Sequence, residues 1–368
     1  MVRVRLIRRA LVARALSAAA VAWLAAGAGA ASGRVVLDYT TVGEFRQPFS
    51  YENCGVAVRG SAEINVNSSL GGPGIAVAGG NDESFDSGET LRFSFGDASG
   101  QAVTATDISY VASVAPGPSD GDAVPAEISI EAFGPGNVSL GVQAFSGTDE
   151  VSVSAAFGGM PIESFVMTAS PDSVRIERVA YQPVPGTTIA VQWTFGGAYQ
   201  RDPIELCGVT LSGSNTLNVG GLGAAGGSGV GVIGGNGGGQ PNQTIDTGET
   251  LTVAFAELET EVAFHMSSFF FVTAAGGVEF DLAAFGAQDV SLGTVHLKTD
   301  VGDVDVSGSF AGAALSRFVI ESSPGGMDGE QLGSVSFRVP EPGGTASGLA
   351  ALASVAALAR LVRSRRRS

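Results

Sequence analysis

The sequence predicts an all-β protein made of two tandem β-sandwiches of the jelly-roll kind. Short runs in which apolar and polar residues alternate recur along the chain, and glycine, proline, asparagine and aspartate separate them, which is typical of half-buried strands joined by turns. The 54 glycines and 15 prolines disfavour helices in general, and we expect no amphipathic helix from Ala31 to Val339. Two long segments also resemble each other, which indicates that one β unit occurs twice.

The chain begins with a basic segment that turns apolar, MVRVRLIRRALVARALSAAAVAWLAAGAGA. Its five arginines precede the apolar core, and the core ends at Ala28-Gly29-Ala30, the small-x-small pattern of a signal peptidase site. We therefore expect residues 1–30 to form a signal peptide with a helical core, and the mature protein to begin near Ala31.

The strands are expected where alternation is clearest. The runs are LRFSF, EISIEAF, EVSVSAAF, SVRIERVAY, TIAVQWTF, DVDVSGSF and SVSFRV, at residues 91–95, 127–133, 150–157, 173–181, 188–195, 303–310 and 334–339. Each run is short and bounded by turn residues, so strands of ordinary length are expected.

The tandem repeat is visible in four pairs of segments. ENCGVAVRGS returns as ELCGVTLSGS, DSGETLRFSF as DTGETLTVAF, EAFGPGNVSLG as AAFGAQDVSLG, and ESFVMTASP as SRFVIESSP. Because the pairs keep their order over the whole unit, they indicate duplication of one domain of about 150 residues and not a solenoid of short repeats. We expect the two sandwiches at residues 31–183 and 187–339, joined at QPVPGTT, residues 182–188.

The charge of the chain is strongly acidic between its two ends. Ten of the 20 basic residues lie in the terminal segments, which leaves ten against 36 acidic residues, a net charge of about −26. Such a surface repels nucleic acid and anionic lipid. It suits a soluble extracellular protein, or one that collects cations, and no nucleic-acid partner is expected.

The chain ends in three parts, VPEP, then an apolar run, then an arginine-rich terminus. The run from Thr345 to Ala359 holds 15 residues without a charge. At about 1.5 Å per residue a helix of that length spans roughly 22 Å, less than the ~30 Å hydrocarbon core of a bilayer. We expect a short apolar helix that is a poor permanent anchor.

Together with the signal peptide, residues 340–368 resemble the PEP-CTERM sorting signal of exported bacterial proteins. The matching residues are Pro340, Glu341, Pro342, Arg363, Arg365, Arg366 and Arg367. The chain departs from the pattern in its alanine-rich apolar stretch and in Arg360, which precedes the final arginine cluster. The resemblance implies transient association with the inner membrane and processing by an exosortase, a membrane-embedded cysteine transpeptidase-like enzyme, in bacteria that make exopolysaccharide. The alternative is an ordinary C-terminal membrane tail.

An acidic turn occurs in both units, as GGNDESFDSGET and as GGNGGGQPNQTIDTGET. Calcium takes six to eight oxygen ligands from carboxylates, amides and carbonyls. The candidate ligands are Asn81, Asp82, Asp86, Glu89, Asn236, Asp246 and Glu249. The favoured alternative is a plain turn before a strand, in which the aspartate accepts backbone hydrogen bonds and the glycine has a positive φ. Apart from calcium, no cofactor is expected.

Motifs that would indicate an enzyme are weak. Residues 221–226 and 229–234 match G-x-G-x-x-G, but neither lies between a strand and a helix, as a dinucleotide site requires. His265 and His296 occur only in the second unit and lack a metal-ligand spacing, so His265 is expected to pack along a strand. We expect no enzyme; a hydrolase using two carboxylates is the most distant alternative.

A glycan-binding module is the second interpretation, because jelly-roll modules of exported proteins often bind glycans. Such sites usually display flat aromatic side chains. The mature chain offers one tryptophan and five tyrosines, Trp193, Tyr39, Tyr51, Tyr110, Tyr181 and Tyr199.

The two cysteines, Cys54 and Cys207, occupy equivalent positions of the two units. An exported protein can form disulfides, but these two residues meet only if the units pack with near two-fold symmetry. Two buried thiols are therefore the favoured expectation, and a bridge is the alternative. Taken together, the sequence predicts an exported, non-enzymatic cell-envelope or extracellular-matrix protein that is processed by signal peptidase and exosortase, with exopolysaccharide as a candidate partner.

Overall fold

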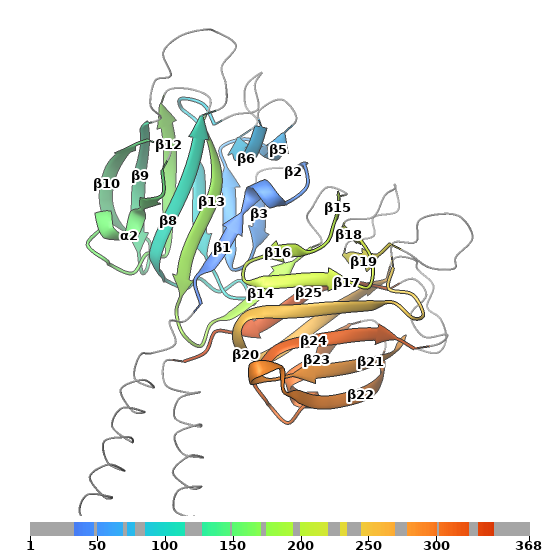
Figure 1. The fold of residues 1–368 in the computed structure, drawn as a ribbon. Coiled ribbons are helices and arrows are strands. Elements are labelled where there is room, and N and C mark those ends of the chain that lie inside the picture. Colours follow the sequence, from blue (N-terminus) through green and yellow to red (C-terminus); the bar gives the residue numbers. More distant parts are fainter. Residues whose placement is uncertain are drawn as a thin grey trace, which may run out of the picture. The chain divides into compact units, whose positions relative to one another are not determined.

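The structure is a computed structural model. It describes residues 33–47, 50–68, 72–77, 85–114, 127–147, 149–170, 174–193, 199–219, 229–233, 244–268, 278–299, 302–323 and 330–341. The expected signal peptide and the apolar and arginine-rich parts of the C-terminal segment lie outside these residues. Residues Gly33–Val339 form one compact unit, and it is almost entirely β-sheet (Figure 1). In the described part of the chain, no helix has the length and apolar character needed to cross a membrane.

The first half of the unit contains two antiparallel sheets. The seven-stranded sheet has the order β11-β8-β13-β6-β5-β2, with β1 also paired to β13. Its strands are β1 (Val35–Asp38), β2 (Phe45–Gln47), β5 (Ile64–Ser68), β6 (Gly72–Val77), β8 (Ala105–Val114), β11 (Val151–Ser152) and β13 (Val174–Pro183). A single 3₁₀ turn, η1 (Tyr39–Thr41), follows β1, where the Asp38 side chain accepts a hydrogen bond from the Thr40 amide.

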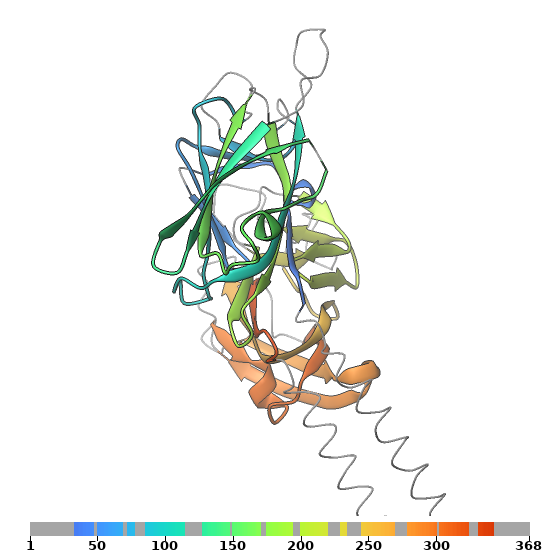
Figure 2. The same ribbon diagram turned by 90° about the vertical axis from the view of Figure 1, so that its left-hand side faces the viewer.

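The second sheet of the first half has the order β10-β9-β12-β7-β4-β3. Its strands are β3 (Ser50–Asn53), β4 (Val56–Gly60), β7 (Leu91–Phe95), β9 (Glu127–Gly134), β10 (Val138–Ser146) and β12 (Ser164–Ser170). The two sheets face each other as layers (Figure 2), and the rings of Phe95 and Tyr181, one from each sheet, lie 4.8 Å apart. Alternate residues of β7 are fully buried, as the LRFSF alternation predicts.

The second half forms a twelve-stranded sheet that branches at one long strand. Its strands are β14 (Thr188–Gln192), β15 (Tyr199–Arg201), β16 (Ile204–Leu206), β17 (Val209–Gly213), β18 (Leu217–Val219), β19 (Val230–Val232), β20 (Thr250–Ser268), β21 (Val278–Phe285), β22 (Ser291–Thr299), β23 (Asp303–Asp305), β24 (Leu315–Ser322) and β25 (Glu330–Arg338). The 3₁₀ turn η2 (Ala287–Asp289) joins β21 to β22. The core includes the stacked rings of Phe264 and Phe318, 5.5 Å apart.

The strand order of the first half recurs in the second. One branch runs β22-β21-β24-β20-β17-β16, which repeats β10-β9-β12-β7-β4-β3 position by position. The other runs β23-β20-β25-β19-β18-β15, which repeats β11-β8-β13-β6-β5-β2, and β14 pairs with β25 as β1 pairs with β13. The 19-residue β20 takes the places of both β7 and β8. The all-β class is confirmed, whereas independent folding of two domains, 31–183 and 187–339, stays a prediction.

Two of the expected strands are wrong over most of their length. Residues 150–157 and 303–310 form only the short strands β11 and β23 and then one helical turn each, α2 (Val153–Ala156) and α3 (Val306–Ser309). Side-chain caps explain the change, because Ser152 accepts a hydrogen bond from the Ala155 amide and Asp305 accepts one from Gly308. Apolar and polar residues do alternate in both segments, but the capping side chains stabilise a helical turn in place of a longer strand.

Candidate functional site

Two hairpin tips carry the cysteines. The β3–β4 turn is Cys54-Gly55, with φ of 54° and 73°, and the β16–β17 turn is Cys207-Gly208, with φ of 57° and 80°. Two consecutive residues with positive φ are the signature of a two-residue type I′ hairpin. The repeated dipeptide therefore places each thiol at the point where its hairpin projects farthest.

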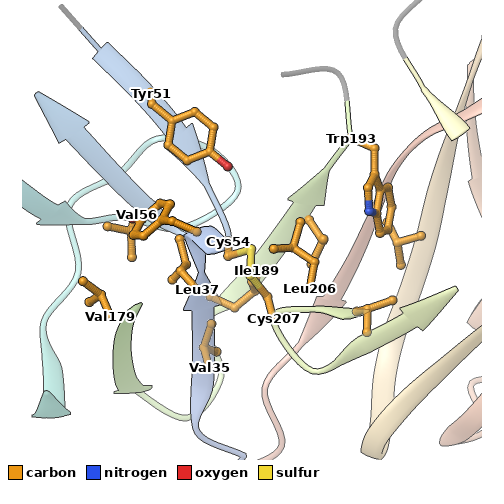
Figure 3. Packing of buried hydrophobic residues seen from close by; sticks show 14 of the residues in the cluster. Val35, Leu37, Tyr51, Cys54, Val56, Val179, Ile189, Trp193, Leu206 and Cys207 are labelled. Atoms are coloured by element: carbon orange, nitrogen blue, oxygen red, sulfur yellow. A yellow bond between two sulfur atoms is a disulfide. The ribbon is translucent and has the colours of Figure 1, made fainter. Parts of the chain in front are cut away.

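The two tips are joined by a disulfide between Cys54 and Cys207, whose Cα atoms lie 6.2 Å apart (Figure 3). The expectation of two free thiols is therefore wrong in this structure. The physical reason is reciprocal packing, since the Cys54 amide donates to the carbonyl of Ala190 on β14 and the Cys207 amide donates to that of Val36 on β1, at 3.0 and 3.2 Å. Each tip thus binds the first strand of the other half, and this brings equivalent positions together.

The surroundings of the disulfide are apolar and closed on the Cys54 side. Leu37, Val56, Ile189 and Leu206 pack around it (Figure 3), and Cys54 has no exposed surface. The buried hydroxyl of Tyr181 donates to the Cys54 carbonyl, and burial raises the pKa of this phenol. It stays protonated at any physiological pH and keeps the hydrogen bond.

A buried asparagine adds a second link across the halves. The Asn53 side-chain amide donates to the Gln192 carbonyl at 2.8 Å and accepts from the Gln192 amide at 2.9 Å. It thereby forms the pair of hydrogen bonds that a strand would supply to β14. The second unit has Leu206 at this position, so the link exists on one side only.

A cleft of about 340 Å³ lies on the Cys207 side of the disulfide. Its lining consists of Val36, Asp38, Thr41, Glu205, Leu206, Cys207, Gly208, Val209, Thr210 and Ala256. Apolar groups alternate with two carboxylates and two threonine hydroxyls, and none of these lining residues is basic. Such a lining can accept hydrogen bonds from a polyhydroxylated or cationic small molecule and would repel an anion. The sequence did not predict this cleft, because residues from both repeats line it.

The acidic turns are hydrogen-bonded turns in their described part. The Asp86 amide donates to Glu89 Oε2 at 2.9 Å, and the Asp246 amide donates to Glu249 Oε2 at 2.8 Å. In the second half both carboxylates are more than nine-tenths buried, and desolvation raises the pKa of Glu249. The corresponding pair in the first half is half-exposed.

The calcium hypothesis stays a prediction. Asn81, Asp82 and Asn236 lie outside the described residues. Within the described ranges, no three His, Cys, Asp or Glu side chains are grouped so that they could hold a metal ion.

The two histidines are each paired with an aspartate. The Nδ1 atoms of His265 and His296 lie 2.9 Å from Asp303 Oδ1 and Asp281 Oδ1. Both pairs join neighbouring strands at exposed positions. His265 does lie along a strand as expected, but it points to solvent.

The aromatic side chains give no flat platform in the described part. Trp193 and the four tyrosines with a described side chain, Tyr39, Tyr51, Tyr110 and Tyr181, are all buried in the core. The side chain of Tyr199 is not among the described side chains. A glycan site of the stacking kind therefore has no support among the described residues.

The motif at the C-terminus begins where the β-sheet ends. The last core residue, Val339, exchanges two backbone hydrogen bonds with the β13–β14 link, to Thr187 and from Gly186, each 2.9 Å long. Pro340 follows directly, and Glu341 is exposed. The remaining residues of the predicted sorting signal, from Pro342, lie outside the described part.

Comparisons with known proteins give only distant matches. No family model and no curated protein matches the chain. Among solved structures, an allantoicase matches at 14% identity and a TM-score of 0.34, covering 69% of this chain and 77% of that one. A fucolectin from striped bass serum, Morone saxatilis, matches at 9% identity and a TM-score of 0.19, covering 82% and 98%. The CBM32 domains of Clostridium perfringens ZmpB, in complex with GalNAc, match at 8% identity and a TM-score of 0.23, covering 83% and 99%. Similarity this low carries no conclusion about function.

Proposed function

We propose that the chain is an exported, non-enzymatic protein of the cell envelope or extracellular matrix, cut at its C-terminal sorting signal. The observation that carries the proposal is the position of Pro340-Glu341-Pro342. The hydrogen-bonded sheet ends at Val339, and every described strand and core residue lies before Pro340. A protease that cuts after Val339 would therefore leave these described strands in place.

Two further features support export. A disulfide links the halves of the chain, and disulfides persist in oxidising compartments outside the cytoplasm. The acidic surface also suits a soluble protein outside the cell. The absence of a shared catalytic motif in the two repeats favours a binding or structural role over an enzyme.

The test is the intact mass of the protein from its native host, measured in membrane, surface and medium fractions. We expect a chain that begins near Ala31 and ends between Pro340 and Gly344, outside the membrane. The matched control replaces Pro340, Glu341 and Pro342 by alanine and should keep the full C-terminus. An unmodified chain that extends through Ser368 in the inner membrane would overturn the proposal and leave a tethered periplasmic protein.

A second candidate function is glycan binding at the cleft beside Cys207. The cleft supports it because Asp38, Glu205 and two threonine hydroxyls can accept and donate hydrogen bonds to sugar hydroxyls, next to an apolar floor. Calorimetry with oligosaccharides from the host's exopolysaccharide tests it. We expect at least a tenfold loss of affinity in E205Q and none in E63Q, an acidic position outside the lining. Equal binding by both variants, or no binding by wild type, would refute a glycan site in this cleft.

A further inference from the structure

Glu259 stands at a position that is an alanine in the first half. Asp107 and Glu261 both have positive φ, 48° and 50°, and the next amides, of Ile108 and Val262, both donate to a serine hydroxyl at 2.8 Å. This alignment puts Glu259 at the place of Ala105. The two residues also make equivalent bridges, Ala105 to Ile162 and Glu259 to Leu315.

One oxygen of the Glu259 carboxyl is buried without a hydrogen-bond partner in the described part of the chain. The residue is 8% exposed, and its Oε2 finds no donor among the described residues. A buried polar atom without a partner costs about 1–3 kcal/mol and more if it is charged. Since Ala105, the first residue of β8, occupies the equivalent position in the first half, the fold itself does not require a carboxyl there.

A second carboxylate, that of Glu257, lies two residues away on the same strand. It is close to the first described residue, since a methyl group added to Gly33 would come within 3.3 Å of the Glu257 carboxyl carbon and within 3.6 Å of both its oxygens. Burial, followed by the negative charge of Glu257, raises the pKa of Glu259 to about 8. Glu259 is therefore largely protonated at pH 7, and a cation that binds beside it would favour its ionised form.

The basic groups near this corner have other partners. Arg338 on β25 pairs with Glu261 at 2.9 Å. Arg34, next to Gly33, pairs with Asp107 and Glu150. Among the described residues, neither Glu257 nor Glu259 forms an ion pair.

We infer that Glu257 and Glu259 form a binding site for one cation at the corner of β20. A bound cation would satisfy the buried Glu259 oxygen and offset the negative charge of the two carboxylates. A divalent metal ion such as Ca²⁺ suits the site, because it prefers carboxylate oxygens.

The test measures thermal unfolding of the full chain at pH 7, with CaCl₂ and with a chelator. We expect Ca²⁺ to raise the Tm of wild type by about 2–4 °C. The rise should vanish in E259A, which copies the residue of the first half and is therefore expected to fold, and in E257Q. The control E261Q removes a carboxylate of the same strand that already has a partner, and it should keep the rise.

A wild type whose Tm does not respond to Ca²⁺, or an equal response in E259A, would show that the pair binds no cation. The mass measurement of the proposed function is independent of this test.

Discussion

The two halves differ at the corner where the chain passes from one sheet to the other, between β7 and β8 in the first half and within β20 in the second. In the first half, the chain leaves β7 at Phe95, makes a loop over residues 96–104 and re-enters the sandwich at β8. Asp97 holds that loop, accepting from the amides of Ser99 and Gln101 at 2.9 Å, and its pKa is lowered first by the Ser99 hydroxyl hydrogen bond. In the second half, β20 passes the corner as one continuous strand. Duplication fixed the strand order but left the corner free to change, and it is the changed corner that holds Glu259.

The outer edges differ as well. Edge strand β10 has no charged residue in VSLGVQAFS, and Val138 and Val142 are 62% and 60% exposed. Its counterpart β22 carries Lys298 paired with Glu279, and His296 paired with Asp281. Charges on an edge strand hinder pairing with other chains. The first half therefore has the less protected edge.

The strongest way to test the equivalence of the halves is to remove matching core rings. Phe165 and Phe318 are both fully buried, and their rings lie 6.1 Å from the equivalent phenylalanines Phe95 and Phe255. F165A and F318A should each lower the free energy of unfolding by about 3–5 kcal/mol. Because residues 33–339 form one compact unit, calorimetry should show one transition in both variants. Two separate transitions, with only one displaced in each variant, would instead establish two independent domains.

The disulfide should give the next largest effect, because it couples the halves. The double variant C54S/C207S opens a loop of 153 residues and should lose about 2–5 kcal/mol. Urea unfolding monitored by circular dichroism measures the loss, and wild type in reducing agent is the control. An unchanged urea midpoint would show that the reciprocal hydrogen bonds of the hairpin tips hold the halves together without the bridge.

The sequence was informative where one local pattern decides the structure. Alternation predicted β7 and β9 correctly, because each has one face in the core. The strand β13 also lies where it was predicted, although its buried residues come in runs and do not alternate. It failed at Ser152 and Asp305, where a capping hydrogen bond replaces strand pairing although the apolar pattern continues. The available signal was a serine or an aspartate, both of which are favoured N-cap residues, at the position where each helical turn begins.

Features that depend on contacts between the repeats could not be predicted. The disulfide forms because each tip binds the first strand of the opposite half, which no single repeat encodes. The cleft beside Cys207 has the same origin. Glu259 was missed for another reason: the corner of the second half is shorter, so alignment of the repeats by their conspicuous motifs does not place Glu259 opposite Ala105.

The effect of Glu259 on stability should depend on pH in chelator. Its folded pKa of about 8 lies above the ordinary value near 4.3, so between these pH values the unfolded chain has lost a proton that the folded chain retains. Stability therefore falls as pH rises through this window and levels off above it. Since one pKa unit corresponds to about 1.4 kcal/mol, E259Q should be more stable than wild type by about 4 kcal/mol at pH 8 and nearly equal at pH 4. A constant difference between the two proteins would contradict the raised pKa.

The helical turns give a smaller, matched comparison. Asp305 accepts from the Gly308 amide at 2.7 Å, whereas Ser152 accepts from the Ala155 amide at 3.3 Å. D305A should cost about 1 kcal/mol and S152A about 0.5 kcal/mol, within the range of N-cap substitutions. Urea unfolding of the two single variants measures both values. The reverse order would mean that the charge and the shorter hydrogen bond of Asp305 do not strengthen its cap.

The smallest change in folding stability should come from giving β10 the protection that β22 has. Val142 lies opposite Glu131 in the β9–β10 register, as Lys298 lies opposite Glu279 in β21–β22. V142K would place a lysine beside that glutamate and should change the free energy of unfolding by less than about 0.5 kcal/mol, because the site is exposed. Light scattering of concentrated protein should nevertheless show slower association, since an uncharged edge becomes a charged one. The control V142T keeps the strand propensity without the charge and should associate like wild type; if V142K does the same, β10 is not the edge through which copies meet.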